Sequence, residues 1–336
     1  MKFLKYLFFL VLIVIIGTAI YIATLDSNYN IQRTRVIKAP VEVVFNSIND
    51  YKNWQHWGPW YEMDSTIVAS YPEQTSGVGG SYTWTGKDGN GSMKTLSLIS
   101  NKEIIQEIDF GMGSTPLVYW LFNEVDGNVE LTWGMKGEST FSEKAYFLTQ
   151  GGVDKAMGPM FDRGLELFDS YLLKQMNAHS FNVQGVVDFG GGYYLYRTTS
   201  CKMEDIERKM GEMFPTVMQY MTDNNITPAG LPFTLHHKWD EENNTTIFST
   251  AIPVMERIIT TGDVLSGHLK KQKTYKTTLK GAYKHLKMAW SESYKNLSES
   301  GLKPLENGEP FEVYKVSPHD APNPAQWVTE IYIPIE

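Results

Sequence analysis

The segment WVTEIYIPI, Trp327–Ile335, decides how the second half of this sequence folds. Its residues alternate in the way that is typical of a β-strand, where neighbouring side chains point to opposite faces of a sheet. Ile331 and Ile333 share one face, and aliphatic side chains there suit a core covered by helices. Glu330 and Tyr332 share the other face. We expect this acid and this phenol to face a groove, the alternative being a solvated glutamate on an exposed sheet.

This strand ends the second copy of an internal repeat. Helices are predicted at Lys202–Met221 and Leu279–Ser298, and each is preceded by a strand, at Tyr193–Arg197 and Leu265–Tyr275. Two strands follow each helix, so each copy is predicted as β-α-β-β. Two copies paired about a pseudo-twofold axis make a sheet with helices on one face and a groove along the seam. Prolines occupy equivalent positions in the two copies: Pro228 and Pro304, Pro232 and Pro310, Pro253 and Pro334.

The duplicated unit and its last strand resemble the GyrI-like family, the effector-binding domains of certain multidrug-responsive transcription activators. In that family a glutamate on the last strand lies in an aromatic pocket and meets lipophilic, often cationic, ligands, and Glu330 is the matching residue. Where those activators have a helix-turn-helix segment, this sequence has an apolar helix and another unit, so the resemblance implies ligand binding without a direct transcriptional role. The ligand-binding residues that we expect are Glu330, Tyr332, Trp327, Tyr194, Tyr196, Tyr275, Tyr283 and Trp290.

An earlier unit, residues 31–176, contains the segment IKAPVEVVFNSINDYKNWQHWGPW, Ile37–Trp60. A short strand, Arg33–Pro40, leads into a helix, Val41–Ile48, and an aromatic turn. Runs rich in β-forming residues follow between residues 66 and 136, separated by turn clusters of Gly, Asn and Asp. Apolar positions from Met157 to Leu172 then have the spacing of one face of a long helix. This order predicts an antiparallel sheet wrapped around a C-terminal helix.

The segment Ile37–Trp60 resembles the opening of the SRPBCC superfamily, the START-like and polyketide-cyclase-like helix-grip fold. Members of that superfamily range from lipid carriers to cyclases, so the resemblance implies a fold without fixing the chemistry. It also implies a cavity between sheet and helix. The residues expected to line this cavity are Trp57, Trp60, Trp84, Trp120 and Phe161, although aromatic residues at such spacing also form plain cores.

An uncharged apolar run, Tyr6–Thr24, is long enough to cross the hydrocarbon core of a membrane. A cleaved signal peptide is the alternative, but its apolar region is shorter and ends in small residues. Residues 1–25 are therefore predicted to be a single-pass anchor in a bacterial inner membrane. Because the short basic end of such an anchor usually stays in the cytoplasm, we expect the globular part outside the cytoplasm.

Composition limits the remaining functions. There are 38 acidic and 30 basic residues, a net charge of −8, which argues against nucleic-acid binding. The single cysteine, Cys201, excludes an internal disulfide and a thiolate cluster. His236 and His237 are adjacent on a strand and face opposite ways, and the other histidines have no ligand spacing, so no metal is expected. We find neither a Gly-x-Ser-x-Gly elbow nor a credible serine–histidine–aspartate set.

The sequence therefore predicts an α+β chain in three parts: an anchor, a helix-grip unit at residues 31–176 and a GyrI-like unit at residues 181–336. The expected function is a membrane-anchored, two-module binding protein for small lipophilic ligands, acting as a sensor, carrier or scavenger without a cofactor. Two alternatives stay open. One is a hydrolase or cyclase-like enzyme that uses Glu330 in the GyrI-like groove. The other is a module that binds a peptide or another protein.

Overall fold

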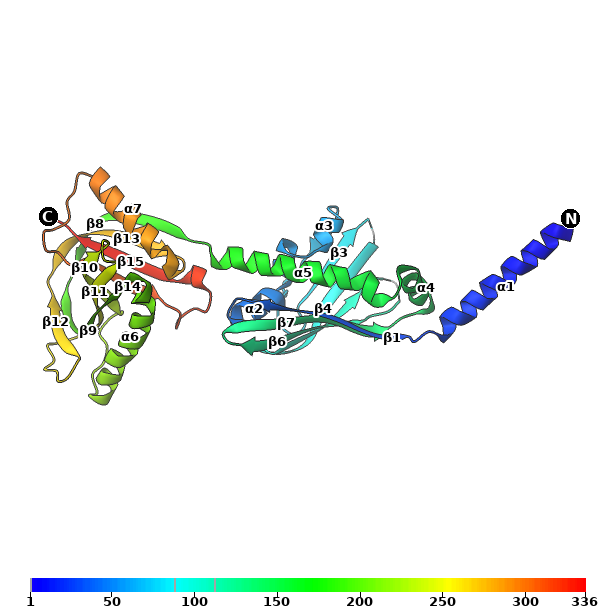
Figure 1. The fold of residues 1–336 in the computed structure, drawn as a ribbon, viewed down its shortest axis with the longest axis horizontal. Helices are drawn as coiled ribbons and strands as arrows, with labels where there is room; N and C mark the ends of the chain where they lie inside the picture. The colour runs from blue at the N-terminus through cyan, green and yellow to red at the C-terminus, as the bar shows by residue number, and fades with distance from the viewer. Residues whose placement is uncertain (1, 88, 112) are drawn as a thin grey trace. The chain divides into compact units, whose positions relative to one another are not determined.

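The computed structural model describes residues 2–87, 89–111 and 113–336, and the chain separates into two units between Gln175 and Met176 (Figure 1). This division falls at the end of helix α5 (Val153–Met176), close to the expected boundary between residues 176 and 181. Each unit contains helices and one antiparallel sheet. The expected α+β class is therefore confirmed.

Helix α1 (Lys2–Thr24) precedes the first sheet. Among the residues that the structure describes, Phe3–Thr24 is the one helical span long and apolar enough to cross a membrane. Its 22 residues rise by about 33 Å, against a hydrocarbon core of about 30 Å. A signal sequence has the same properties. Lys144 of helix α4 (Phe141–Gln150) holds the end of α1, because its Nζ donates a hydrogen bond of 2.6 Å to the carbonyl oxygen of Leu25.

The first unit contains a seven-stranded sheet in the order β1-β7-β6-β5-β4-β3-β2. Strands β2 to β7 follow one another as a meander, and β1 pairs with β7 along its whole length. The strands are β1 (Asn28–Ile37), β2 (Val68–Ser70), β3 (Ser81–Gly86), β4 (Gly89–Ile99), β5 (Glu103–Asp109), β6 (Leu117–Val125) and β7 (Asn128–Glu138). The shorter helices are α2 (Val41–Asn49), α3 (Trp60–Met63), α4 (Phe141–Gln150) and the 3-10 helix Tyr51–His56.

Helix α5 lies along this sheet (Figure 1). Phe161 of α5 stacks on Trp133 of β7 with ring centroids 4.4 Å apart. Arg33 of β1 forms an ion pair of 3.0 Å with Asp162 of α5. Gly164 permits this close packing, because a Cβ there would lie 2.4 Å from Cζ3 of Trp133. The long C-terminal helix is present as predicted, whereas α4 was not predicted.

The second unit contains an eight-stranded sheet in the order β12-β9-β11-β10-β14-β15-β13-β8. Its strands are β8 (Ser180–Phe189), β9 (Gly192–Lys202), β10 (Phe233–Asp240), β11 (Thr245–Val254), β12 (Leu265–Leu269), β13 (Gln272–Lys280), β14 (Phe311–Val316) and β15 (Val328–Pro334). Its helices are α6 (Ile206–Asp223) and α7 (Leu286–Glu299), together with the 3-10 helices Met203–Asp205, Tyr283–His285 and Pro324–Gln326.

The predicted β-α-β-β repeat is incomplete, because each copy is β-β-α-β-β. Strand β8 was not predicted, and the strand expected at Leu265–Tyr275 is two strands joined by a turn. The helix expected from Leu279 begins at Leu286. The reason is that Leu279 belongs to β13 and is buried beneath α7 beside Ile331, so an apolar residue assigned to the helix belongs to a strand.

The two copies exchange their first strands. β8 opens the first copy but pairs with β13 of the second, whereas β12 opens the second copy and pairs with β9 of the first. The copies also meet in the middle, where Thr234 of β10 pairs with Glu312 of β14. These two residues are equivalent in the repeat, so the pseudo-twofold axis passes between them.

Both helices cover the same face of this sheet. α6 packs on Leu195 of β9 and Ile252 of β11, and α7 packs on Ile331 and Ile333 of β15. The opposite face carries a separate cluster that includes Tyr332. The predicted alternation along β15 is therefore confirmed: the isoleucines face the helices, and Tyr332 faces away from them.

Two very short connections curl the sheet around that second face. Gly190 and Gly191 alone join β8, at one edge, to β9, which lies beside the opposite edge. Lys270 and Lys271 join β12 to β13 in the same way. Three backbone steps span at most about 11 Å, so the two ends of the sheet must approach each other. Gly191 has φ +71°, and a Cβ there would lie 2.3 Å from the carbonyl oxygen of Leu269.

We expect the full-length chain to remain in the membrane fraction through washes with high salt and with carbonate, because transferring the apolar α1 helix out of lipid is strongly unfavourable. Membrane fractionation and N-terminal sequencing measure this. Release by salt alone, or a mature N-terminus beyond Thr24, would contradict the anchor and favour a cleaved signal sequence.

We expect Gly191→Ala to destabilise the second unit by about 2–4 kcal/mol, because the new methyl group meets both a left-handed φ and the Leu269 carbonyl. Gly185→Ala is the matched control: its φ is +78°, but a Cβ there has nothing within 4 Å. It should cost only about 1–2 kcal/mol. Urea unfolding of the two variants measures the difference, and equal values would contradict the close approach of the two connections.

Candidate functional site

The face turned away from the helices carries a continuous set of rings, which we call the aromatic face. Phe311 and Tyr332 stack with centroids 4.9 Å apart, and Phe233 lies 6.2 Å from Phe311. Tyr194 continues the set at 5.2 Å from Phe233. The middle of the set is buried, and its ends are half-exposed. The members of the aromatic face are Phe189, Tyr194, Tyr196, Phe233, Phe311 and Tyr332.

Glu330 lies at one end of the aromatic face with both carboxylate oxygens occupied. Lys276 Nζ lies 2.9 Å from Oε1, and the Tyr332 hydroxyl donates a hydrogen bond of 2.6 Å to Oε2. Lys315 Nζ is 3.9 Å from Oε1. Lys276 also lies over the Tyr332 ring, 5.3 Å from its centroid. The side chains of Glu330 and Lys276 are 13% and 19% exposed, so this ion pair is shielded but still open to solvent.

These contacts determine the charge state of the site. Burial alone would raise the pKa of the Glu330 carboxyl, but hydrogen bonds from Tyr332 and Lys276 and the charges of both lysines lower it on balance. Burial and the adjacent carboxylate raise the pKa of Tyr332. At neutral pH Glu330 is therefore an anion and Tyr332 a protonated donor. An ionised, fully engaged carboxylate does not suit a general acid, one role that Glu330 could have in the hydrolase alternative.

The structure divides the expected ligand-binding residues between the two faces of the sheet. It brings Glu330, Tyr332, Tyr194 and Tyr196 to the side turned away from the helices. Four others are on the helix-covered side, so their assignment to the same groove is wrong. Tyr275 is core beneath α7, Tyr283 and Trp327 stack on each other at 4.8 Å, and Trp290 of α7 hydrogen-bonds to Glu312.

Glu312 is the centre of a second polar cluster, buried on the helix-covered side. It is 3% exposed and accepts hydrogen bonds from Trp290 Nε1 at 2.6 Å and from the Tyr314 hydroxyl at 2.7 Å. His236 Nε2 lies 3.4 Å away. Burial alone would raise the pKa of this carboxyl, but His236 and the hydrogen bonds lower it on balance. The cluster is enclosed, and its own side chains compensate the charge of Glu312. We therefore interpret it as a structural feature of the core.

Sequence spacing did not predict a third arrangement, which joins Ser249, His237 and Glu309. His237 Nδ1 lies 2.7 Å from a carboxylate oxygen of Glu309, and His237 Nε2 lies 2.6 Å from Ser249 Oγ. A β-bulge between His236 and Lys238 places His237 outside the β10–β11 register. The sequence analysis considered only serine–histidine–aspartate sets and did not predict this arrangement, in which the carboxylate belongs to a glutamate. The two signals that could have found it are the adjacent histidines and the equivalence of Ser249 to Glu330.

The tryptophans of the first unit pack on one another. Trp120 is fully buried and stacks on Trp133 at 4.7 Å, and Trp57 meets Trp120 edge-on at 6.0 Å. Phe161 covers Trp133 from α5. Trp60 and Trp84 are half-exposed at the margin of this set, beside Trp57 and Phe110 respectively. Of the residues expected to line a cavity, Trp57, Trp120 and Phe161 are thus core residues in this conformation.

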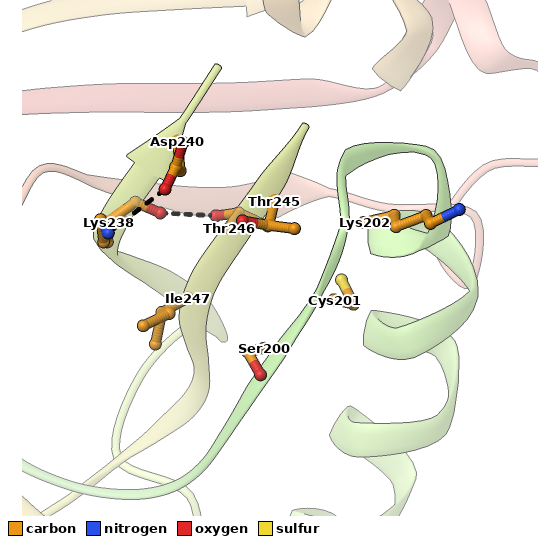
Figure 2. A pocket seen from close by; sticks show the side chains of 8 residues that line it. All are labelled: Ser200, Cys201, Lys202, Lys238, Asp240, Thr245, Thr246 and Ile247. Carbon is orange, nitrogen blue, oxygen red and sulfur yellow. Dashed lines mark hydrogen bonds and ion pairs between the residues drawn. The ribbon is translucent and has the colours of Figure 1, made fainter. Parts of the chain in front are cut away.

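A pocket of about 340 Å³ lies elsewhere in the second unit (Figure 2). Its polar groups bond to each other: Thr246 Oγ1 donates to the Lys238 carbonyl oxygen at 2.9 Å, and Lys238 pairs with Asp240 at 3.3 Å. Burial raises the pKa of the Cys201 thiol, so the pocket offers no thiolate. We prefer Glu330 and the aromatic face as the candidate site. The pocket is lined by Ser200, Cys201, Lys202, Lys238, Asp240, Thr245, Thr246 and Ile247.

Comparison with known proteins identifies the class of the second unit. Residues 193–336 match the family model described as the GyrI-like small molecule binding domain. This part of the chain is therefore a GyrI-like small-molecule binding domain, as the sequence predicted. No curated protein sequence matches the chain.

Solved structures with similar coordinates are remote in sequence. The crystal structure of the EcmrR C-terminal domain is 16% identical, with a TM-score of 0.40, and the match covers 47% of this chain and 98% of that chain. EcmrR in a complex with DNA is 16% identical, with a TM-score of 0.41 and coverage of 58% and 70%. Protein CV1439 from Chromobacterium violaceum is 16% identical, with a TM-score of 0.34 and coverage of 42% and 95%. These values are too low to transfer a function.

We expect Glu330→Gln to reduce the loss of stability that acid causes. Because the folded-state pKa of Glu330 is lowered, its ionised form contributes stability above the unfolded-state pKa, and this contribution is lost as pH falls through the folded-state value. Urea unfolding of the wild type and the variant between about pH 6 and pH 3 measures the effect. Glu256→Gln, on an exposed loop, is the control. Parallel pH dependences for all three proteins would contradict the ion pair.

Proposed function

We propose that the second unit binds a small, largely apolar molecule on the aromatic face. The match to a small-molecule binding domain supports binding as such. The rings of the aromatic face supply apolar contact area, and the half-buried polar group at Glu330 supplies orientation, which is the usual composition of a ligand site. The observation that carries the proposal is a shielded ion pair placed directly against stacked rings.

The head group of this ligand is acidic. A cationic ligand, which the GyrI-like resemblance implies, would need a carboxylate free to receive it, but Lys276 and Tyr332 already occupy both oxygens of Glu330. Lys276 and Lys315 together carry two positive charges against one negative charge. A carboxylate on the ligand therefore gains a charge-assisted hydrogen bond, whereas an ammonium group meets two like charges.

The anchor helix and the first unit determine where in the cell this binding domain acts. We propose that α1 anchors the protein in the inner membrane with the units outside the cytoplasm, and that the first unit has the helix-grip fold of the SRPBCC superfamily. Its strand order and the long helix α5 along the sheet support that fold. In this arrangement the protein acts as a sensor, carrier or scavenger for lipophilic acids close to the membrane surface.

The test uses three matched ligands: 2-naphthylacetate, 2-(2-naphthyl)ethanol and 2-(2-naphthyl)ethylamine. Calorimetry with full-length protein in nanodiscs, corrected with empty nanodiscs, should give the acid an affinity at least about tenfold above that of the amine. Lys276→Met should weaken acid binding by about tenfold or more, the scale of one lost charge-assisted hydrogen bond. Glu330→Gln should strengthen acid binding, because it frees Lys276, and should leave the alcohol unchanged.

Glu256→Gln changes the net charge by the same amount and should alter none of these affinities. Tightest binding by the amine, weakened by Glu330→Gln, would contradict the acidic head group and support a cationic ligand. Failure of all three compounds to bind saturably would contradict small-molecule binding on the aromatic face.

A further inference from the structure

We propose that Ser249, His237 and Glu309 form a nucleophilic site that hydrolyses esters of small aromatic or aliphatic acids. The three side chains come from β11, from the bulge in β10 and from the loop before β14. Two contacts, His237 Nε2 to Ser249 Oγ at 2.6 Å and His237 Nδ1 to Glu309 Oε1 at 2.7 Å, link them in one line. Hydroxyl, imidazole and carboxylate in this order are the parts of a nucleophile, its base and the group that orients the base.

The geometry assigns a role to each atom. Glu309 accepts the hydrogen bond of the His237 Nδ1–H group, which leaves the lone pair of Nε2 directed at the Ser249 hydroxyl. Thr198 Oγ1 lies 2.7 Å from Ser249 Oγ, and either hydroxyl can be the donor of this hydrogen bond. When the serine proton lies toward Nε2, Thr198 is the donor, and the hydrogen bonds run from Thr198 through Ser249 to His237.

This site lies on the same face of the sheet as Glu330. Ser249 pairs with Leu235, which belongs to the core of the aromatic face, and Ser249 is the repeat equivalent of Glu330. Glu309 lies close enough to Tyr194 for its charge to contribute, with burial, to raising the pKa of Tyr194 to about 12. An apolar molecule held against these rings would thus lie near Ser249, and its neighbours must move to uncover the buried hydroxyl for attack.

Alternation along β10 separates the two histidines, and the bulge leaves His237 without a paired residue on β11. In a regular strand, neighbouring side chains alternate between faces, and a bulge inserts a residue that the partner strand does not match. His236 turns to the buried Glu312 on the helix-covered side, and His237 turns to Ser249. The side chain of His237 is 26% exposed and that of Glu309 is 44% exposed, so both are accessible from solvent.

The reaction needs only water as a second reactant. Ser249 Oγ attacks the ester carbonyl carbon while its proton moves to His237 Nε2. The bond from that carbon to the alkoxy oxygen then breaks, and the alcohol leaves with the proton from His237. Water attacks the acyl carbonyl and gives a proton to His237, and Ser249 Oγ departs with that proton as the free acid is released.

The residues around Ser249 limit the rate of ester hydrolysis. Ser249 is fully buried beneath its neighbours, and β11 is paired on both sides at this position, with Leu235 and with Thr198. The peptide group of Ser249 is therefore engaged in the sheet and does not form an oxyanion hole. Thr198 is exposed and its hydroxyl adjoins Ser249 Oγ, so it is the donor available to a developing oxyanion. We expect slow turnover and detectable acylation of the serine.

The experiment measures 2-naphthol release from 2-naphthyl acetate by full-length protein in nanodiscs, with the site of acylation mapped by mass spectrometry after a fluorophosphonate probe. The wild type should release 2-naphthol above background and carry one adduct, on Ser249. Ser249→Ala and His237→Gln should each lower the rate by about 100-fold or to background. Glu309→Gln should lose most of the activity, whereas Glu309→Asp should retain it, because the orienting carboxylate is preserved.

Ser293→Ala is the matched control. Ser293 is also fully buried, but its hydroxyl donates to the Ala289 carbonyl oxygen in α7. This variant should keep wild-type rate and labelling. Unchanged ester hydrolysis in Ser249→Ala, an adduct at another residue, or no release of 2-naphthol by folded wild-type protein would each overturn the proposal. Thermal unfolding of each variant confirms that a lost signal is not lost folding.

Discussion

The shape of the second unit depends on two connections of two residues each. A flat eight-stranded sheet would hold its edges tens of ångströms apart, because neighbouring strands are about 4.8 Å apart. Gly190–Gly191 and Lys270–Lys271 nevertheless join strands near opposite edges. The sheet must twist and curl until its edges meet, and the concave side must then be filled. The aromatic face fills it, so the same constraint that bends the sheet also brings these rings together.

Glu312, which is buried, and Glu330, which is half-buried, show that a charge is stabilised differently on the two faces of the sheet. Glu312 and Glu330 lie on adjacent strands and point to opposite sides of the sheet. Glu312 is enclosed by helices and by neutral donors, Trp290 and Tyr314, together with His236. Glu330 has lysine partners and a route to solvent. The charge of Glu312 is compensated within the core, whereas the charge of Glu330 lies where another molecule can reach it.

The elements of both sheets follow largely from local patterns. The alternation along Trp327–Ile335 correctly separates the isoleucines from Glu330 and Tyr332. Local patterns do not predict a strand, or the face on which a side chain lies, where pairing with a distant segment determines it. β8 has polar residues at Ser180, Asn182, Gln184 and Asp188, and it finds its partner some ninety residues later, so nothing nearby marks it as a sheet edge. Tyr275 and Trp290 were assigned to the groove by residue type, but the face of Tyr275 depends on the pairing of β13, and that of Trp290 on which side of the sheet α7 covers. The bulge at His237 likewise exists only in the pairing with β11.

The exchange of first strands between the two copies has a consequence for synthesis. β8 leaves the ribosome long before β13, since Ser180 pairs with Lys280. At about 5–20 residues per second, the edge of β8 waits roughly 5–20 s for its partner. During that interval neither half of the sheet is complete, and an unpaired strand is open to pairing with a neighbouring nascent chain. The sheet of the second unit therefore cannot close before β13 has been made, and β8 has no native partner until then.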